Sequence, residues 1–253
     1  MTDRAASTED LRAARWLRWA VAFVWLATGV LWVHPEYRAV GGGYLARLGL
    51  PLALMPATCL FEVGLAFVVA FGPTSRVVTA LQVGMIAGFT AILGALEPML
   101  LVSPFGMLTK NLPIVACVSA AFLIEREGFT PRARRLLRVG MAVIWLTEGL
   151  FPKVLFQQQV ELAIAASLHL SRVTPSTILT ALGLVQIASG VLALTLSGRW
   201  LRAVLAAQVG ALVALMIVMT WLDPVLWAHP FGPLTKNAPI LIGTLVVRRR
   251  CCS

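Results

Sequence analysis

The sequence predicts an all-α integral membrane protein of about eight transmembrane helices, arranged as two four-helix bundles in parallel repeat. Three observations predict it: an apolar composition, apolar segments of bilayer-spanning length, and a motif that occurs twice. Of the 253 residues, 59% are hydrophobic and only 13% are charged, whereas soluble domains carry about 25% charged residues. The mean hydropathy is +0.86. We therefore expect lipid to be the main solvent of this chain.

Apolar segments follow one another along the whole chain, and a crossing needs about 20 such residues. They must be helices, because lipid offers no partner to unpaired backbone groups and no alternating pattern typical of a barrel is present. The segments span residues 17–33, 51–71, 77–96, 108–124, 137–151, 178–196, 200–222 and 234–247. Residues 34–49 and 157–170 are expected to form short amphipathic helices on the membrane surface.

The formal net charge of +10 does not indicate a nucleic-acid partner, because the basic residues are not gathered in one basic, aromatic-lined patch. They stand at the ends of the apolar segments, as the positive-inside rule describes. Alternating loops place six of the 21 Lys and Arg residues on one side (Arg38, Arg47, Lys110, Lys153, Arg172 and Lys236), which leaves 15 on the side of the termini. Both termini are therefore expected in the cytoplasm of a bacterial cytoplasmic (inner) membrane. All three lysines fall on the disfavoured side.

The clearest pattern is a duplication. The segment EPMLLVSPFGMLTKNLPI (residues 97–114) reappears as DPVLWAHPFGPLTKNAPI (residues 223–240), and residues 17–29 match 137–149 more weakly. We call residues at equivalent positions of the two copies repeat mates. The chain divides into a first unit (1–125), a cytoplasmic linker (126–136) and a second unit (137–253). Four crossings per unit predict parallel repeats; a duplication that only enlarges the bundle fits the pattern equally well.

The motif PFGxLTKNxP, which ends the third helix of each unit and opens the fourth, resembles the DoxX-like family. The copy at residues 229–239 is especially similar, and Glu62 inside a second helix also fits the family's pattern. The resemblance implies four-helix membrane units, some tied to sulfur or quinone redox systems and others acting as accessory factors. This chain departs from the single-unit pattern by its doubling. Ser103 also replaces His229 in the first copy, so a role for the histidine applies to the second half alone.

A ligand site is predicted at the motif in each half. The helix after Lys236 is too short to cross a hydrocarbon core of about 30 Å, so the turn before it is expected to lie below the membrane surface. A helix N-terminus beside a lysine attracts a carboxylate, a phosphate headgroup or a quinone oxygen. The alternative is that Lys110 and Lys236 extend to the interface while Asn111 and Asn237 cap their helices.

Two acids lie inside apolar segments, where a carboxylate is costly and indicates function. The repeat mate of Glu62 is Gln186, and that of Glu148 is Thr28. Each half therefore has one acid, on different helices, which indicates that the halves have specialised. We expect Glu148 to pair with Lys110 or Lys236, either as a structural clasp or as part of a proton or ligand site.

The candidate ligand-binding residues are thus Lys110, Asn111, Lys236, Asn237, Glu62, Glu148, Gln186 and His229. No metal site is expected, because no pair among His34, His169 and His229 has the spacing that places two ligands on one helical face. Glycines at positions 84, 88, 183 and 190 are expected where helices approach closely.

The expected function is an accessory component of a membrane redox system that interacts with quinone or lipid. The chain has no evident ligand set for a redox centre and no evident cofactor, so a membrane or peripheral oxidoreductase partner would supply the centre, and the chain is not expected to be a catalyst by itself. The alternatives are a small-solute transporter with a path between the halves, and an assembly factor or chaperone for another membrane protein. Homo-oligomerisation stays open.

Overall fold

The computed structural model describes residues 6–168 and 172–250, and every regular element in these ranges is helical. The first half contains α1 (Thr8–Val30), α2 (Pro35–Arg47), α3 (Leu54–Phe71), α4 (Arg76–Leu96) and α5 (Asn111–Glu127). The second half contains α6 (Pro131–Leu150), α7 (Gln159–Ala166), α8 (Pro175–Thr195), α9 (Gly198–Leu222) and α10 (Asn237–Arg250). Each predicted apolar segment overlaps one helix, and each predicted surface stretch contains one short helix. The all-helical prediction is confirmed.

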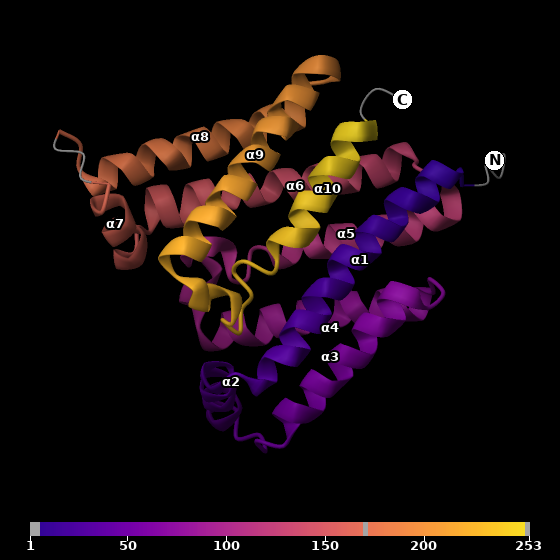
Figure 1. Ribbon diagram of the computed structural model, residues 1–253, viewed down its shortest axis with the longest axis horizontal. Helices are drawn as coiled ribbons and strands as arrows, with labels where there is room; N and C mark the ends of the chain where they lie inside the picture. Colours follow the sequence, from indigo (N-terminus) through magenta and orange to yellow (C-terminus); the bar gives the residue numbers. More distant parts are fainter. Residues whose placement is uncertain (1–5, 169–171, 251–253) are drawn as a thin grey trace.

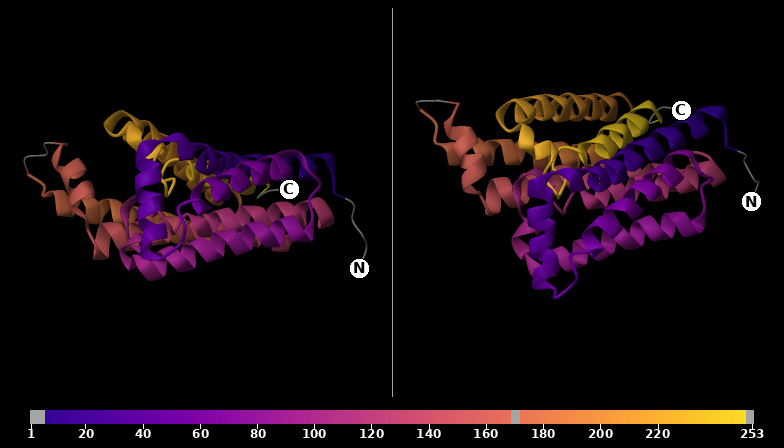
Figure 2. Two further views of the ribbon diagram at one scale, coloured as in Figure 1. Left: turned by 90° about the horizontal axis from the view of Figure 1, so that it is seen from below. Right: turned by 60° about the horizontal axis from the view of Figure 1, so that its bottom comes forward.

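The two halves repeat the same packing. Helix α1 packs on α3 as α6 packs on α8, and α5 and α10 each contact both α1 and α6. The central helices are therefore α1, α5, α6 and α10, with α3 and α4 on one flank and α8 and α9 on the other (Figure 1). Figure 2 shows the short helix α2 running across the ends of the long helices.

Five helical stretches are long and apolar enough to cross a membrane: residues 8–33, α3, α4, α8 and α9. A sixth crossing results if α6 and α7, which are bent by 84° at their junction, count as one span. The expected eight crossings are therefore not confirmed. Helix α10 has 14 residues, a length of about 21 Å, and α5 has 17 residues with charges in its last turn.

Large apolar side chains are exposed on the flanking helices, as a lipid environment requires. Trp221 is 87% exposed, and Leu60, Phe71, Val77 and Val185 are also mostly exposed. In water an apolar surface this extensive would drive association. Together with the apolar helices, this surface identifies an integral membrane protein.

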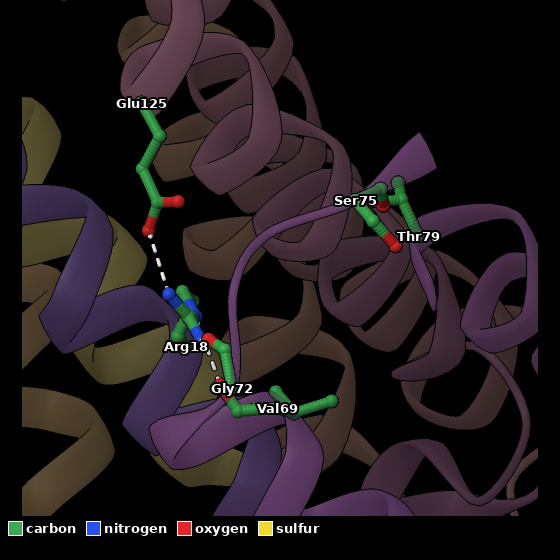
Figure 3. A network of polar contacts seen from close by, with 6 residues as sticks. All are labelled: Arg18, Val69, Gly72, Ser75, Thr79 and Glu125. Carbon is green, nitrogen blue, oxygen red and sulfur yellow. Dashed lines mark hydrogen bonds and ion pairs between the residues drawn. The ribbon is translucent and has the colours of Figure 1, made fainter. Parts of the chain in front are cut away.

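One end of the bundle is held by arginines, and we call it the arginine end. Arg18 of α1 donates hydrogen bonds to the carbonyls of Val69 (2.8 Å) and Gly72 at the end of α3, and pairs with Glu125 of α5 at 3.0 Å (Figure 3). Its repeat mate Arg138 donates in the same way to the carbonyls of Ala193 and Leu196 at the end of α8. These bonds satisfy the last carbonyls of a helix and place a cation at its negative end.

Glycines let helices of the same half approach closely. A Cβ on Gly183 would lie 2.6 Å from the Gly149 carbonyl oxygen, and one on Gly190 would lie 2.8 Å from Leu146. The prediction of close approach is confirmed for these two positions. It is wrong for Gly84 and Gly88, because no atom lies within 4 Å of a Cβ placed there.

Candidate functional site

The two copies of the motif form similar turns at the end of the bundle opposite the arginines, although Phe105 has a φ of 66° and its repeat mate Phe231 has no positive φ. We call this end of the bundle the lysine end; it comprises loops 97–110 and 223–236 together with α2 and α7. Gly106 and Gly232 have φ angles of 65° and 59°, a left-handed conformation that glycine adopts without strain. The amide of Lys110 donates to the Gly106 carbonyl and that of Lys236 to the Gly232 carbonyl, both at 3.1 Å. The repeated sequence thus folds into a repeated turn.

The two turns exchange their lysines. Lys110 Nζ donates a hydrogen bond to the Pro233 carbonyl at 2.6 Å, and Lys236 Nζ donates one to the Met107 carbonyl at 2.8 Å. Met107 and Pro233 are themselves repeat mates. Each lysine therefore extends from its own half into the turn of the other half.

The phenylalanines of the motif are exchanged in the same way. Phe231 packs with Leu100 and Leu108 of the first half, and its ring meets that of Tyr44 on α2 edge-on at 5.8 Å. Phe105 packs against a cluster formed by the second half, which contains Met219, Leu226, Leu234 and Ile164. The two predicted sites are consequently one joint region shared by both halves.

All three lysines of the chain are buried at this end. Lys110 is 6% exposed, Lys153 is 5% exposed and Lys236 is 8% exposed. Lysines that extend to the interface would keep their ammonium groups in water, so the interface-anchoring alternative is wrong. The capping alternative is wrong for Asn111, because its amide group donates to Thr90 Oγ1 at 2.7 Å and α5 has no side-chain cap.

The acids that face the two lysines also come from the opposite half. Burial lowers the pKa of Lys110 to about 8, and nearby Glu148 acts in the opposite direction. Burial lowers the pKa of Lys236 to about 7, with Lys110 adding to the effect and Glu62 opposing it. Lys110 of the first half thus faces Glu148 of the second half, and Lys236 of the second half faces Glu62 of the first half.

On the Glu148 side most of the charged groups have a partner, although Glu161 Oε2 has no hydrogen bond among the described residues. Thr109 Oγ1 donates to Glu148 Oε1 at 3.1 Å. Lys153 Nζ forms an ion pair with Glu161 at 3.0 Å and lies 3.3 Å from the Glu148 carbonyl. Within the described ranges, Glu148 makes no ion pair with Lys110 or Lys236 at 4.0 Å or less. The expected ion pair of Glu148 with a motif lysine is therefore not formed, and the buried ion pair on this side joins Lys153 to Glu161.

On the Glu62 side several buried polar atoms have no partner. Glu62 is 6% exposed, and the Thr28 hydroxyl interacts with its carboxyl group. In the described part of the chain, Glu62 Oε2, Thr235 Oγ1 and Asn237 Oδ1 lack a hydrogen-bond partner. The repeat explains this difference: the mate of Glu148 is Thr28, so Thr235 lacks the carboxylate that Thr109 has.

Gln186 and His229 lie at the edges of this region. The Cβ of Gln186 would lie 3.0 Å from a Cβ on Gly149, next to Glu148, and Gln186 Oε1 has no partner among the described residues. His229 Nδ1 accepts a hydrogen bond from the Phe231 amide at 3.3 Å, and burial lowers the histidine pKa. His169 lies outside the described residues. Residues 6–168 and 172–250 contain no group of three or more metal-binding side chains.

Sequence reasoning missed three residues of the region. Lys153 and Glu161 form the buried ion pair, although Glu161 belongs to a helix expected on the surface. Tyr37 of α2 lies beside Glu62 and Cys59, and burial raises the pKa of its hydroxyl. Of these three residues, only Lys153 could have been singled out from the sequence, since it is one of three lysines on the side that the positive-inside rule disfavours.

The interface between the halves is closely packed at mid-height. A Cβ on Gly140 would lie 2.3 Å from that of Ala116, and one on Gly243 would lie 3.2 Å from Cys117 Sγ. The buried glutamines bond within their own halves: Gln82 accepts from Trp25 at 3.2 Å, and Gln208 donates to Ser189 at 2.9 Å. These contacts show no continuous polar lining between the halves in the described ranges.

A sequence profile described as the DoxX-like family matches two regions of this chain, residues 22–119 and 142–245. Together they cover most of the chain, and each contains one lysine turn. The two matches confirm the tandem duplication. Comparison with curated proteins and with solved structures gave no match.

Proposed function

Since this chain belongs to the DoxX-like family and contains the family's unit twice, we propose that it is an accessory component of a membrane redox system that holds a quinone or a lipid headgroup at its lysine end. A membrane or peripheral oxidoreductase supplies the redox centre. The protein lies in a bacterial cytoplasmic membrane with both termini in the cytoplasm, so the lysine end faces outward. All helices except α2 and α7 cross the bilayer, and the two shortest of these eight, α5 and α10, are shielded by the helices around them.

One observation carries this proposal: every lysine of the chain is buried at the same end, together with Glu62 and Glu161. The other 18 basic residues are arginines. Lysine differs from arginine in that burial readily changes its protonation. A group of buried lysines and acids therefore suits binding of an oxygen-bearing headgroup or transfer of a proton to it.

Within this end, the Glu62 side is the better binding position. Its unpartnered acceptors, Glu62 Oε2 and Asn237 Oδ1, match the hydroxyl groups of a reduced quinone or a headgroup. Lys236 can donate to a ligand oxygen in place of the Met107 carbonyl. The Glu148 side, where Lys153 and Glu161 pair, serves as the structural counterpart.

A small-solute transporter is the weaker candidate. Transport between the halves needs a continuous polar lining at mid-membrane, whereas Gly140 packs on Ala116 and Gly243 packs on Cys117 there. An assembly factor would hold a protein partner tightly and retain no small molecule.

The test is purification from native membranes in mild detergent, with mass spectrometry of the molecules that stay bound. The unaltered protein is expected to retain quinone or lipid, and Lys236→Met is expected to lose it. Glu97→Gln is the control, because it breaks only an exposed ion pair with Arg47 at the same end. Retention of a protein partner with no small molecule would favour the assembly factor and contradict the proposal.

A further inference from the structure

A second site lies at the arginine end, far along α1 from the lysine turns. A cavity of about 270 Å³ opens between α1 and α10, and its wall includes Glu9, Arg12, Trp16, Val246, Arg249 and Arg250. Three of these six side chains are arginines and one is an acid. The cavity is too small for a whole lipid but has room for a headgroup.

The arginines are held in place around the cavity. Arg250 pairs with Asp10 at 2.9 Å and with Glu9 at 3.3 Å. The guanidinium of Arg249 lies over the Trp16 ring, 4.6 Å from its centroid. Since Glu9 is engaged by Arg250, Arg12 and Arg249 leave the wall with an excess of positive charge, which suits an anion.

The equivalent groove of the other half, between α5 and α6, is filled. The repeat mates of Trp16, Arg249 and Arg250 are Leu136, Leu123 and Ile124. Leu123 is 9% exposed and Ile124 is fully buried. The α5–α6 contact is therefore apolar and filled, whereas the equivalent α1–α10 contact contains a basic cavity.

An exposed apolar stripe leads away from the cavity along α1. Arg12, Trp16, Trp19, Phe23, Leu26 and Val30 follow one another at spacings of three or four residues, which places them on one face of the helix. Trp19 is 47% exposed, Phe23 42% and Val30 50%. The stripe belongs to a candidate membrane span, so acyl chains can lie against it directly below a headgroup in the cavity.

We propose that the cavity binds the phosphate headgroup of an anionic phospholipid, whose acyl chains lie along this stripe of α1. Free phosphate would meet the same arginines but would gain nothing from Trp19 and Phe23. Basic pockets between membrane helices are suited to such headgroups. The inference is independent of the function proposed for the lysine end.

The test uses the full chain, freed of lipid in detergent, and measures binding of added phosphatidylglycerol by native mass spectrometry. Arg12→Gln/Arg249→Gln is expected to weaken binding roughly 30-fold, from the loss of two arginines near the headgroup. The matched control is Arg132→Gln, which changes the mate of Arg12 beside the filled groove and is expected to bind like the unaltered protein. Arg12, Arg132 and Arg249 are all exposed. Thermal unfolding verifies that each variant is folded.

Two further arms separate lipid from free phosphate. Phe23→Ser is expected to weaken phosphatidylglycerol binding and leave competition by inorganic phosphate unchanged. Phosphatidylcholine is expected to bind much more weakly than phosphatidylglycerol. Equal binding of the two lipids, equal loss in the Arg132 control, or inorganic phosphate binding as tightly as the lipid would each overturn the proposal.

Discussion

Lys110 and Lys236 occupy equivalent positions of the two repeats, and each donates a hydrogen bond to a backbone carbonyl in the turn that carries the other. The exchange of Phe105 and Phe231 follows the same pattern. The halves are thus interlocked at the lysine end, so neither turn keeps its surroundings when the other is altered.

The first prediction is that the two lysines are energetically coupled. Lys110→Met or Lys236→Met removes a donor and leaves a buried carbonyl unpaired, at a cost of about 1–3 kcal/mol. Because one altered turn already disturbs the other, the double variant should lose less than the sum of the single losses, with a coupling energy of about 0.5–3 kcal/mol. Denaturant unfolding of the four proteins in detergent measures this cycle. Strictly additive losses would show that the turns act independently.

The second prediction concerns pH. Unfolded lysine keeps its proton up to a pKa of 10.5, whereas burial lowers the pKa of Lys236 to about 7 and that of Lys110 to about 8 in the folded protein. Between the pKa of a lysine in the folded protein and its pKa in the unfolded chain, unfolding takes up protons. Stability therefore rises with pH from about 7 to about 10.5. Below about pH 7 both states hold both protons, and the two lysines cause no further change.

Between pH 7 and 8 Lys236 contributes more to this rise than Lys110, because burial lowers its pKa further. The midpoint of thermal unfolding should rise over this range in the unaltered protein, and Lys236→Met should have a smaller rise. Lys110→Met should also have a smaller rise, because the Lys110 ammonium contributes to the lowering of the Lys236 pKa. Equal slopes in all three proteins would contradict a lowered Lys236 pKa.

The duplication and both lysine turns could be predicted from the sequence, because residues 97–114 and 223–240 keep the same order and spacing. The contact between Lys110 and Pro233 could not be predicted from the sequence, since only tertiary packing brings residues so distant in the chain together. The ion pair of Lys153 and Glu161 depends on the 84° bend between α6 and α7, which follows a π-helical turn over Phe151–Leu155. The expected surface helix at 157–170 implies a bend after residue 151, but no local pattern indicated that Glu161 would be buried against Lys153.

The glycines show a second limit. In a soluble protein the apolar face of a helix faces the core, but in lipid both faces are apolar. The sequence therefore could not tell Gly183, which touches Gly149, from Gly88, which has open space beside it. The eight crossings are not confirmed for a related reason: the central α10 is covered by other helices and needs less hydropathy than a helix exposed to lipid.

The third prediction tests the buried ion pair. Glu161→Gln leaves the Lys153 ammonium buried without its partner, and we expect a loss of about 3–5 kcal/mol. Replacing both residues by Met removes both buried charges and should restore most of that loss. The exposed pair of Arg47 and Glu97, at 3.2 Å, is the control; Glu97→Gln should cost less than about 1 kcal/mol. Unfolding free energies in detergent decide this, and equal losses in the two single variants would contradict it.

The fourth prediction concerns the glycine contacts inside each half. A Cβ on Gly149 would lie 2.6 Å from the Gly183 carbonyl oxygen, and one on its repeat mate Gly29 would lie 2.6 Å from the Cys59 carbonyl oxygen. Both obstacles are backbone atoms of a packed helix, so the helices must separate. Gly29→Ala and Gly149→Ala should each cost about 1–3 kcal/mol.

Gly210 of α9 is the matched control for these two glycines, because it is also helical but has no atom within 4 Å of an added Cβ. Gly210→Ala should be neutral or should stabilise the protein by up to about 1 kcal/mol, the difference in helix preference between the two residues. Thermal unfolding of the three variants in one detergent gives the comparison. A loss at Gly210 equal to that at Gly149 would mean that helix contact does not set the cost, and the close approach of α6 to α8 would then be wrong.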